Sequence, residues 1–591
     1  MPEAGSRNTT RNTVPTAANT LKILQINLNK SEKAHLELIN GQLSKTWDII
    51  LIQELHTTVF NYIRTPTNFR PVYPENRGRD GSKVRSAIWV NKKLETKHWK
   101  IIDIPDTNDI TAIQMKGEYG KLTIFNIYND CTHSRNEDKL KSFIRKHANK
   151  IIATETDHMI WAGDFNRHHP LWDRSEDTHL FTREAITAAN GLIDLLDEYG
   201  MEMALPKGIP TLQHMRSKRY SRPDNVFCTQ PIMDHITRCE VDTRIRPPCT
   251  DHFPIATTIS LPQHRIEEPP SYDFRNMDWE EFRTHLVSRL EEVPDPEAPT
   301  TKEQLHEMVR SLTEAIQDTI RAKVTLRKPR PDSKRWWNGD LKRLKRELNK
   351  LRANSYRFRA LTDHPIHAET RRKSNQYGEE IVKAKRQHWA EYLEEVTENN
   401  IWATNRYLKE PSGDGGNPRI PTLKVKNNRG EEIEVNDNRD KAKYFAKTFF
   451  PPPPRTSAVP TQHEYPQPLP DPPAITKTQI AEQISRLSPY KASGPDGIPN
   501  IILIKCFDLL EEYLIHIIQA ILGRGWYYDP WREFTTVVLR KPGKPNYQAP
   551  KAYRPIALLC TMAKLVTALV ASDLSHLVET HNLLPNTHFG G

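Results

Sequence analysis

The sequence has 591 residues, too many for one hydrophobic core, and its length predicts three or four folded units. Hydrophobic residues make up 37% and charged residues 27%, a balance that excludes wholesale disorder. The formal net charge is +11, and residues 321–389 hold 21 lysines and arginines against 7 aspartates and glutamates. Such a block suits a polyanionic partner, although a solvated helical face is the simpler explanation of a charge run taken alone.

Cysteine usage and hydropathy narrow the class of protein further. None of the six cysteines forms a Cys-x-x-Cys pair, which argues against a disulfide framework and a zinc finger and favours a reducing compartment. No apolar run approaches the roughly 20 residues that span a bilayer, so we expect no membrane partner. Residues 1–20 lack the apolar segment of a secretion signal, and we expect a disordered tail there.

Short apolar runs alternate with helical patterns over residues 21–262, which we take as the first domain. Strands are expected at residues 21–26, 48–53, 87–90, 122–128 and 158–162. Helices are expected at 35–43 and 182–199, the second ended by Gly200. Strands mixed with helices over this length predict one α/β sandwich with its helices outside.

Proline-rich segments separate the later parts of the chain. Residues 262–299 are rich in proline and acid and are expected to form a linker, and residues 302–410 have a helical pattern. The segment 411–418 breaks that pattern, and the proline cluster at 451–473 predicts an extended spacer. We therefore expect a linker with a basic helical region over 263–474 and a last folded unit over 475–591.

Six short polar clusters end expected strands of the first domain. They are Asn27-Leu-Asn29, Gln53-Glu54, Asn126-Ile-Tyr128, Gly163-Asp-Phe-Asn166, Arg222-Pro-Asp224 and Thr250-Asp-His252. Each alone is weak evidence, because Asp-Asn pairs often cap turns and an Asp-His pair is usually a surface pair. All six in this order resemble the endonuclease/exonuclease/phosphatase superfamily, which includes DNase I and the apurinic/apyrimidinic endonucleases. The resemblance implies a four-layer α/β sandwich.

The same resemblance implies a metal site. Phosphodiester hydrolysis is very slow without a catalyst, so the site must activate water and offset charge on the phosphoryl oxygens. A hard cation held by one or two carboxylates, with positions left for water and phosphate, is the arrangement that Mg²⁺ prefers, with Mn²⁺ as a substitute. By resemblance Glu54 is the principal metal ligand, assisted by Asn27 and Asp251, and Asp251 also counts among the catalytic residues.

The remaining catalytic roles also come from the resemblance. Asp164 would activate the attacking water, and Asn166 would orient it. His252, held by Asp224, would donate a hydrogen bond to the scissile phosphate as charge develops there. Tyr128 would contact the same phosphate. The alternative for each residue is a structural role at a turn or a strand end.

Two positions depart from the family pattern. The family often has Asn three residues after the phosphate-contacting Tyr, where this sequence has Cys131, and Asn129 or Thr132 can substitute. Thr250 replaces the usual Ser before Asp-His and keeps the hydroxyl. These departures concern the geometry of the Tyr128 loop.

Three features resemble the jockey-like subset of LINE-type (non-LTR) retrotransposon endonucleases. The first is His168-His-Pro-Leu-Trp172, directly after Asn166. For its two histidines, packing of the loop on Trp172 is favoured over metal binding. The second is Gly208-Ile-Pro-Thr211, which precedes Asp224. Between them and Asp224, residues 213–222 form a basic stretch that we expect to be a hairpin entering a DNA groove and reading its width or flexibility. Its candidate nucleic-acid-binding residues are Arg216, Lys218, Arg219 and Arg222.

A basic amphipathic helix is expected after Trp336-Trp-Asn338. Leu341, Leu344, Leu348 and Leu351 recur at helical spacing, with cations on the other face. Such a helix can bind phosphates, lie on a membrane or engage calmodulin. In LINE-type proteins a similar region precedes the polymerase, so we favour RNA binding. The candidate RNA-binding residues are Lys342, Arg343, Lys345 and Arg346.

The last unit resembles the start of a LINE-type reverse transcriptase. The motifs are 492–499 with Gly494-Pro-Asp-Gly497, 537–544, 553–559 with Tyr553-Arg-Pro-Ile556, and 583–591. Lys541 and Arg554 are candidates for the triphosphate of an incoming nucleotide. The paired catalytic carboxylates of polymerases are missing, since the sequence contains no Asp-Asp, and we expect a truncated fingers region.

These observations combine into one functional hypothesis. The chain is expected to be a Mg²⁺-dependent endonuclease that nicks double-stranded target DNA and primes reverse transcription of retrotransposon RNA, with an incomplete RNA-directed DNA polymerase domain. The alternatives are an abasic-site repair endonuclease and a non-catalytic RNA-binding relic. The hypothesis implies the nucleus, with a cytoplasmic ribonucleoprotein phase, and leaves the oligomeric state undefined.

Overall fold

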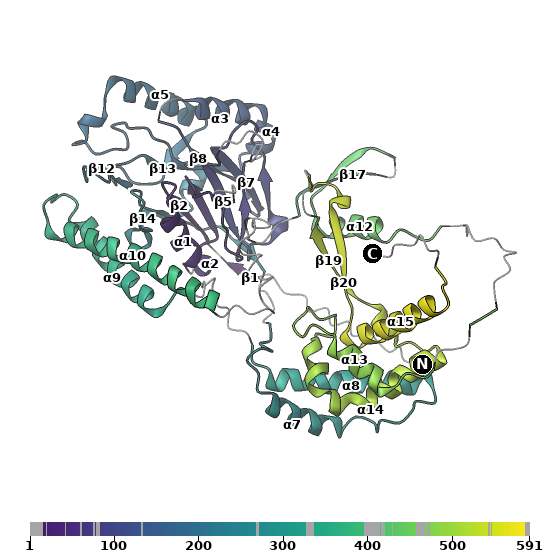
Figure 1. Ribbon diagram of the computed structural model, residues 1–591. Coiled ribbons are helices and arrows are strands. Elements are labelled where there is room, and N and C mark those ends of the chain that lie inside the picture. Colours follow the sequence, from purple (N-terminus) through teal and green to yellow (C-terminus); the bar gives the residue numbers. More distant parts are fainter. Residues whose placement is uncertain are drawn as a thin grey trace. The chain divides into compact units, whose positions relative to one another are not determined.

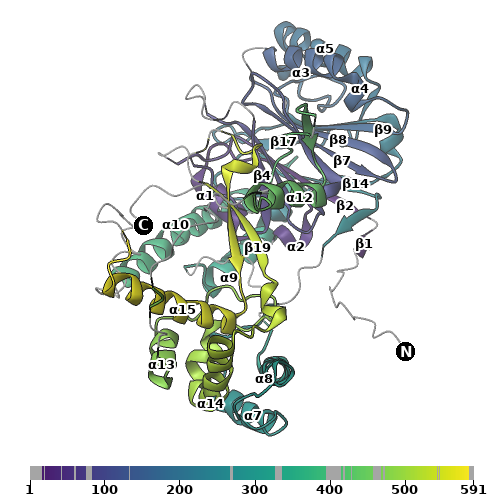
Figure 2. The ribbon, with the colours of Figure 1, turned by 90° about the vertical axis from the view of Figure 1, so that its right-hand side faces the viewer.

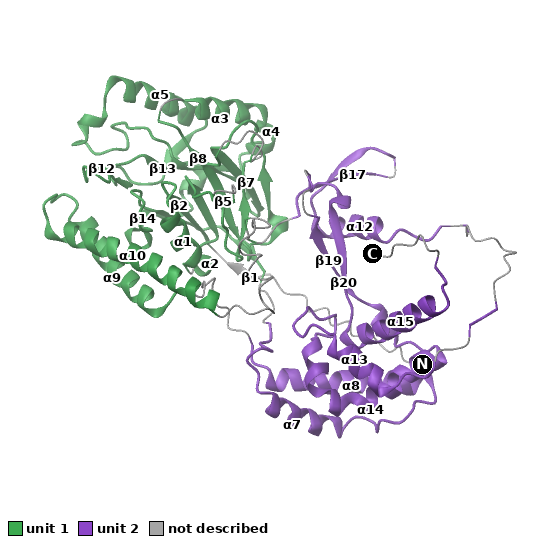
Figure 3. Ribbon diagram, in the orientation of Figure 1, with its two compact units in different colours: residues 1–268, 329–419 green, residues 269–328, 420–591 purple. Residues whose placement is uncertain are grey.

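The computed structural model describes residues 16–18, 20–41, 43–58, 62–74, 77, 83–131, 134–266, 271–326, 336–394, 414, 416, 420–427, 429–454, 456, 467–469, 473–541, 544 and 546–584. The chain divides into two units (Figure 3): residues 1–268 with 329–419, and residues 269–328 with 420–591. The length had suggested three or four units. The expected linker over 263–474 is not one segment between domains, because its residues are divided between the two units.

Two six-stranded sheets form the centre of the first unit. The first has the order β10 (Met201–Met203), β13 (Asp224–Thr229), β9 (Asp157–Asp164), β8 (Gly120–Tyr128), β7 (Ile110–Gly117) and β6 (Trp99–Ile102). The second has the order β14 (Ile236–Val241), β15 (Ile255–Ile259), β2 (Leu21–Asn27), β3 (Ile49–Gln53), β5 (Ser86–Asn91) and β4 (Phe69–Val72). Most neighbours are antiparallel, but β2 pairs with β3 and β8 with β9 in parallel.

Apolar side chains from both sheets form a core between them. Leu51 and Ile88 of one sheet share this core with Ile124 and Ile160 of the other. Strand β3 reads Ile-Ile-Leu-Ile and is buried throughout, because sheet faces on both of its sides are covered. The apolar runs at residues 21–26, 48–53, 87–90, 122–128 and 158–162 are all strands, as predicted.

Helices cover the outer faces of both sheets. Helices α3 (Arg135–Lys146) and α5 (Arg183–Glu198) pack on the sheet of β7, β8 and β9, as Figures 1 and 2 show. Helix α1 (Glu32–Asn40) packs on the other sheet, followed by the short α2 (Leu43–Thr46). The predicted four-layer α/β sandwich is confirmed.

Short elements complete this unit. They are α4 (Ala148–Ile151), α6 (Gln230–Met233), the 3-10 turns η1 (Thr96–His98), η2 (Thr178–Leu180) and η3 (Thr243–Ile245), and the hairpin of β11 (Leu212–Gln213) and β12 (Tyr220–Ser221). Strand β1 (Thr16–Ala18) pairs antiparallel with β16 (Gln263–Arg265). The expected disordered tail is therefore wrong for residues 16–18, and residues 1–15 and 19 lie outside the described part.

Two helices from the expected linker belong to the first unit. They are α9 (Gly339–Arg357) and α10 (Pro365–Glu394). Leu341, Leu344 and Leu348 of α9 pack with Tyr377 and Ile381 of α10, so the predicted apolar stripe forms the contact between the helices. We call α9 and α10 the helical pair. Residues 395–410, the end of the expected helical region, lie outside the described residues.

The second unit has one helical core and a smaller strand cluster. Helices α7 (Trp279–Leu290) and α8 (Lys302–Lys323) share this core with α13 (Lys477–Ser485), α14 (Asn500–Arg524) and α15 (Thr561–Thr580). The smaller cluster contains β17 (Leu423–Lys426), β18 (Glu432–Val435), α12 (Asn438–Phe449), the turn η5 (Pro550–Ala552) and the antiparallel hairpin of β19 (Thr535–Arg540) and β20 (Tyr553–Leu558). The turn η4 (Asp529–Arg532) packs on the helical core through Trp531. The segment expected to be a proline-rich linker thus contributes α7 to a folded core.

The Gly-Pro-Asp-Gly motif is a turn packed against the start of α15. A Cβ atom on Gly494 would lie 2.4 Å from the backbone nitrogen of Cys560, so only glycine fits there. Thr561 donates a hydrogen bond to the carbonyl of Ile498 after this turn. None of the described helices is long and apolar enough to cross a membrane.

Replacing Leu286 of α7 tests whether this segment belongs to the second core. Leu286 is fully buried, so Leu286→Ala should destabilise the second unit by about 2–5 kcal/mol. Hydrogen exchange of α14 amides in the full chain should accelerate accordingly. Val287→Ala is the matched control, since Val287 is exposed on the same helix and its truncation should change little. Equal exchange in both variants would contradict a shared core.

Candidate active site and basic surfaces

Strands of both sheets end at one edge of the sandwich, and their polar clusters meet there. In the parallel pairs Asn27 lies opposite Gln53 and Tyr128 opposite Asp164. Asp224 lies opposite Asp164 on the other side of β9. The two sheets are joined at this edge, because Asn27 Nδ2 donates to Asp164 Oδ2 at 2.8 Å. The structure therefore brings the predicted clusters together.

The backbone around these side chains is unusual. Gly163 has φ +152°, and a Cβ atom there would lie 1.9 Å from the carbonyl oxygen of Ile127. Two residues of the predicted site adopt left-handed backbone, Glu54 at φ +46° and Asn166 at φ +49°. Such conformations cost free energy in residues other than glycine and cluster at functional sites.

Asp164, Asp224 and His252 form a buried network. His252 shares a hydrogen between its Nδ1 and Asp224 Oδ2 at 2.7 Å, and its Nε2 lies 3.9 Å from both Asp164 Oδ2 and Asp251 Oδ1. Asp224 also accepts a bond from Gln25 Nε2 at 2.9 Å. The imidazole is thus oriented by Asp224, with its other nitrogen facing the gap between Asp164 and Asp251.

Burial and charge shift the pKa values of this network in a coupled way. Burial and the neighbouring charge of Asp224 raise the pKa of Asp164. Burial by itself would lower the pKa of His252, but the charge and hydrogen bond of Asp224 outweigh it and raise this pKa to about 9. The expected state near neutral pH is therefore an imidazolium beside Asp224 and an Asp164 carboxyl that takes up a proton more readily than usual.

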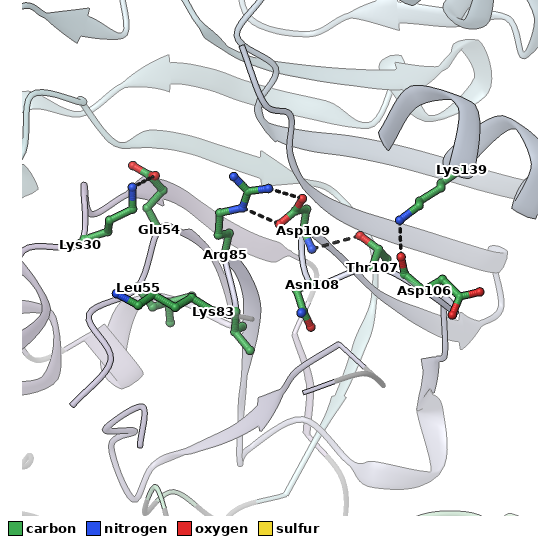
Figure 4. A pocket seen from close by; sticks show the side chains of 11 residues that line it. Lys30, Glu54, Leu55, Lys83, Arg85, Asp106, Thr107, Asn108, Asp109 and Lys139 are labelled. Carbon is green, nitrogen blue, oxygen red and sulfur yellow. Dashed lines mark hydrogen bonds and ion pairs between the residues drawn. The ribbon is translucent and has the colours of Figure 1, made fainter. Parts of the chain in front are cut away.

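Glu54 forms an ion pair with a lysine and lines a pocket beside the site. Lys30 Nζ is 2.8 Å from Glu54 Oε1. Both residues line a pocket of about 450 Å³ that also contains Arg85, Lys83 and Lys139 (Figure 4). Burial, and then the charges of Glu54 and Asp164, raise the pKa of Tyr128 well above its usual range. Tyr128 therefore keeps its hydroxyl proton and can donate a hydrogen bond.

Several residues of this site were not among those predicted from the sequence. Arg85 lies with its guanidinium 4.8 Å from the Tyr128 ring and pairs with Asp109 and Asp130 at 2.7 Å each. Gln25 and Lys30 contact Asp224 and Glu54 directly. Lys30 follows Asn29 within two residues of a recognised cluster, a signal that could have been used. Arg85 stands at no recognisable motif and could not have been found from the sequence.

The two departures from the family pattern have structural explanations. Asn129 does not substitute for the missing Asn, because its side chain is buried and donates to Glu137 Oε1 at 2.5 Å. Cys131 is exposed, and Thr132 lies outside the described residues. Thr250 keeps the function of a hydroxyl residue, because its Oγ1 donates to the Asn27 carbonyl at 2.8 Å and accepts a bond from the His252 amide.

The histidines after Asn166 contact Asp173 and Trp172. His168 Nδ1 lies 3.3 Å from Asp173 Oδ2, and the His169 ring lies 5.4 Å from the Trp172 ring. Thr211, the other jockey-like feature, is buried and accepts a bond from the Asp224 amide through its Oγ1 at 3.1 Å. Both features therefore make structural contacts, His168 and His169 within their own loop and Thr211 with the backbone of Asp224.

The predicted basic hairpin is present as β11 and β12, and it is attached to the active site. The amide of Gln213 donates to the Asp251 carbonyl at 2.9 Å, and Leu212 forms an isolated antiparallel β-bridge with His252. Arg216, Lys218 and Arg219 are exposed at its tip. Their proposed contact with DNA is consistent with this position and stays a prediction.

Arg222 is a correction to the expected DNA-binding set. Its side chain is 1% exposed, so it cannot contact DNA. It donates to Asn225 Oδ1 at 2.9 Å and 2.6 Å and to the carbonyls of Leu205 and Trp172. Burial lowers its pKa to about 10, and these acceptors compensate a buried cation. Its role is to hold the loops behind β13 together.

The basic residues of α9 are divided between two surfaces. Lys342, Arg343 and Arg346 are exposed, and Arg343 pairs with Asp340 at 3.0 Å. Lys345 instead lies 3.1 Å from the buried Glu37 of α1, which corrects its expected role in RNA binding. Asn338 of the Trp-Trp-Asn motif caps α9 by accepting a bond from the Leu341 amide.

Lys541 and Arg554 lie close together at one end of the β19–β20 hairpin. Arg554 is paired with Leu539, and the amide of Lys541 donates to the Ala552 carbonyl. Lys541 directly follows β19, so this register puts it near Arg554 at the same end of the hairpin. The structure brings them together, and their role in nucleotide binding stays a prediction.

Arg222→Gln and Arg219→Gln should affect the melting temperature differently, because Arg222 is buried and Arg219 is exposed. Arg222→Gln leaves several buried carbonyls without their donor, so it should lower the melting temperature by several degrees, on the scale of roughly 2–4 kcal/mol. Arg219→Gln should leave the melting temperature unchanged, because Arg219 is exposed. Thermal unfolding monitored by circular dichroism measures both. Equal melting temperatures would contradict the structural role of Arg222.

Part of the sequence that carries this site is similar to known proteins. The sequence model of the endonuclease–reverse transcriptase family matches residues 122–256, which run from β8 to β15. The chain is 26% identical over 311 residues to the 115 kDa protein of the type-1 retrotransposable element R1DM of Drosophila melanogaster, covering 52% of this chain and 29% of that protein. It is 23% identical over 602 residues to the RNA-directed DNA polymerase from transposon BS of the same organism, covering 97% and 61%.

A third relative and two solved structures extend the comparison. The RNA-directed DNA polymerase from mobile element jockey of Drosophila melanogaster is 24% identical over 579 residues, covering 92% of this chain and 57% of that protein. The endonuclease domain of TRAS1, a telomere-specific non-LTR retrotransposon, is 23% identical with a TM-score of 0.33, covering 41% and 99%. An AP endonuclease from Leishmania major is 10% identical with a TM-score of 0.34, covering 41% and 88%.

The chain spans between 29% and 61% of the length of these three curated relatives. The family match lies on the strands that carry Tyr128, Asp164, Asp224 and His252. The chain is therefore similar to jockey- and R1-type non-LTR retrotransposon proteins, and residues 122–256 match the endonuclease–reverse transcriptase family.

Proposed function

We propose that the first unit is a Mg²⁺-dependent endonuclease that nicks one strand of double-stranded DNA. The observation that carries this proposal is the network of Asp164, Asn27, Asp224 and His252 at the common edge of the two sheets. It puts a carboxylate with a raised pKa within 3.9 Å of an imidazolium nitrogen. A base and a charge stabiliser at this separation are what phosphodiester hydrolysis needs.

The donor atoms favour one position for the metal over another. Asp164, Asp224 and His252 have ligand atoms within 4.8 Å of one another. The raised pKa of His252 keeps it protonated near neutral pH, however, and a protonated imidazole has no lone pair for a metal. Glu54, Asn27 and Asp251 supply oxygen donors only, as a hard cation prefers. We assign the Mg²⁺ site to this second set, where the ion would supply positive charge to the phosphoryl oxygens.

The chain's own residues then have separate tasks. Asp164 accepts a proton from the attacking water, helped by its raised pKa, and Asn166 orients that water. Asn27 holds Asp164 through its Nδ2, so the base keeps a fixed position. His252 donates from Nε2 to a phosphoryl oxygen, while Asp224 keeps it charged. Tyr128 keeps its hydroxyl proton and donates a hydrogen bond to the same phosphate.

The names of the relatives suggest the biological purpose of the nick. Two of them are described as RNA-directed DNA polymerases of mobile elements. We propose that the 3′-hydroxyl left by the nick primes reverse transcription of a bound retrotransposon RNA. Lys541 and Arg554 would then bind the phosphates of a nucleotide in the polymerase of which this second unit forms a part. The reaction would take place in the nucleus, where the target DNA is.

Nicking of supercoiled plasmid tests the proposed function. The purified chain should convert it to the open circular form in Mg²⁺ or Mn²⁺ and stop when EDTA removes the metal. Asp164→Asn and His252→Ala should each reduce the rate by at least about a hundredfold, the scale for removing a base or a charge stabiliser. Gel analysis of the plasmid forms over time gives the rates.

Asp157→Asn is the matched control for Asp164→Asn. Asp157 is a buried carboxylate at the opposite end of the same strand, where it pairs with Lys121 at 3.0 Å. Its substitution should keep the nicking rate within a few-fold of the wild type. The proposal is wrong if the wild type is inactive with both metals, or if Asp157→Asn and Asp164→Asn lose the same activity.

The pKa of His252 gives an independent prediction for the metal-free protein. Because this pKa is raised to about 9, the His252–Asp224 pair stabilises the fold below the ordinary histidine pKa, and that stability is lost as the pH rises to about 9. Asp224→Asn removes the largest of the charges that raise this pKa and leaves the burial, so the pKa should fall well below 9.

Nuclear magnetic resonance of isotope-labelled histidine would follow His252 through this range. His35 is an internal control, because burial lowers its pKa to about 4 and Asp224 does not contact it. It should therefore stay neutral in both proteins above pH 5. A His252 that titrates near 6.5 in the wild type and in Asp224→Asn would contradict the ion pair.

A further inference from the structure

The helical pair is attached to the endonuclease along both of its helices. Lys345 of α9 lies 3.1 Å from Glu37, and Lys385 of α10 lies 3.0 Å from Glu32, so both helices contact α1. Arg352 is buried and donates to the backbone carbonyl of Arg246 after η3. Figure 1 shows the pair running beside α1 and β14. These contacts fix the pair on the same body as the active site.

One end of the helical pair lies under the basic hairpin and the catalytic loop. The Tyr356 ring contacts Tyr220 of β12 with ring centroids 6.3 Å apart and Phe253 with centroids 5.1 Å apart. Its hydroxyl donates to the Pro210 carbonyl at 2.9 Å. Since Phe253 directly follows His252, Tyr356 connects α9 to both the hairpin and the Thr250–His252 segment.

Arg246 strengthens the same junction. Its guanidinium lies 4.1 Å from the Phe253 ring and donates to the Thr250 carbonyl at 2.9 Å. Its own carbonyl accepts the bond from Arg352. The loop that carries Asp251 and His252 is therefore packed between the sheet and α9.

Cations from the hairpin and the helices gather at this junction. Arg359 lies with its guanidinium 4.7 Å from the Tyr356 ring, and Arg371 is exposed on α10. The pKa of Lys218 is lowered by burial first and then by the charges of Arg371 and Arg246, so like charges lie near one another. We call Arg216, Lys218, Arg219, Arg359 and Arg371 the cationic seam. Clustered like charges destabilise a fold unless a polyanion binds them.

We propose that the cationic seam binds the phosphate backbone of the target double helix beside the nick, so that the helical pair is part of the endonuclease's DNA-binding surface. This inference rests on the proposed function, since it assumes that DNA is held at the Asp164–His252 site. Duplex DNA is favoured over RNA because the seam is continuous with the catalytic loop. A helix cut there would extend along the hairpin onto the helical pair.

Salt-dependent DNA binding by the full chain tests this proposal. Arg359→Gln combined with Arg371→Gln should remove two phosphate contacts, which lowers the slope of log affinity against log salt by about 1.8. The measurement uses Asp164→Asn protein in EDTA with a linear duplex several helical turns long, so that no cleavage occurs. At about 0.1 M salt the loss in affinity should exceed roughly tenfold.

Two further double variants control for charge and folding. Lys350→Gln with Arg372→Gln removes the same charge from the same two helices, at positions that line a separate pocket with Glu347, and should keep the wild-type slope. Arg359→Lys with Arg371→Lys keeps the charge and should restore most of the affinity. If the Gln and control variants lose the same affinity, only overall charge matters and the seam is refuted.

Parallel measurements separate the possible outcomes. Single-stranded and structured RNA are titrated with the same variants, and a loss confined to RNA would overturn the proposal in favour of an RNA surface. Plasmid nicking by the seam variant with an intact Asp164 should slow at physiological salt and recover at low salt. A wild type that binds duplex through the seam but never nicks would refute the proposed function alone, whereas normal nicking with an unchanged slope would refute the seam alone.

Discussion

Two buried carboxylates on neighbouring strands, Asp164 and Asp224, set the main constraint on this structure. They lie opposite one another in the register of β9 and β13, and neither has solvent to stabilise its charge. Their charges are stabilised instead by hydrogen bonds from Asn27 and Gln25 of β2, in the other sheet, and from the imidazole of His252. The two sheets therefore meet through polar bonds at this edge, and the apolar core between them holds those partners at bonding distance.

Most of the sandwich and the members of its site could be predicted from the sequence, for physical reasons that are visible in particular residues. The continuous apolar run of β3 indicates a buried strand, and the helical spacing of the apolar residues in α5 indicates an amphipathic helix. Both patterns can be recognised without knowledge of the tertiary structure. The six polar clusters each end a strand, so their convergence follows from parallel pairing of β2 with β3 and β8 with β9. Which side chains touch could not be predicted, since Gln25 and Arg85 reach the site from positions without a motif.

Charge runs were the least informative part of the sequence, because they do not show which cations face solvent. Arg222 and Lys345 stand in basic stretches, yet one is buried among carbonyls and the other pairs with a buried carboxylate of α1. The proline-rich segments misled in the same way. The composition of residues 262–299 suggested a linker, but Phe282 and Leu286 of α7 belong to the core of the second unit. Tertiary packing decides both cases, and neither the charge nor the proline content reports it.

The position of the metal beside Glu54 decides which residues bind the ion and which move the proton. Paramagnetic Mn²⁺ added to isotope-labelled protein broadens the nuclear magnetic resonance signals nearest to it. We expect the amides of Asn27, Glu54 and Asp251 to broaden first, and Glu54→Gln to abolish this effect. Broadening that begins elsewhere, or that persists unchanged in Glu54→Gln, would contradict the assignment of this edge as the metal site of a nuclease.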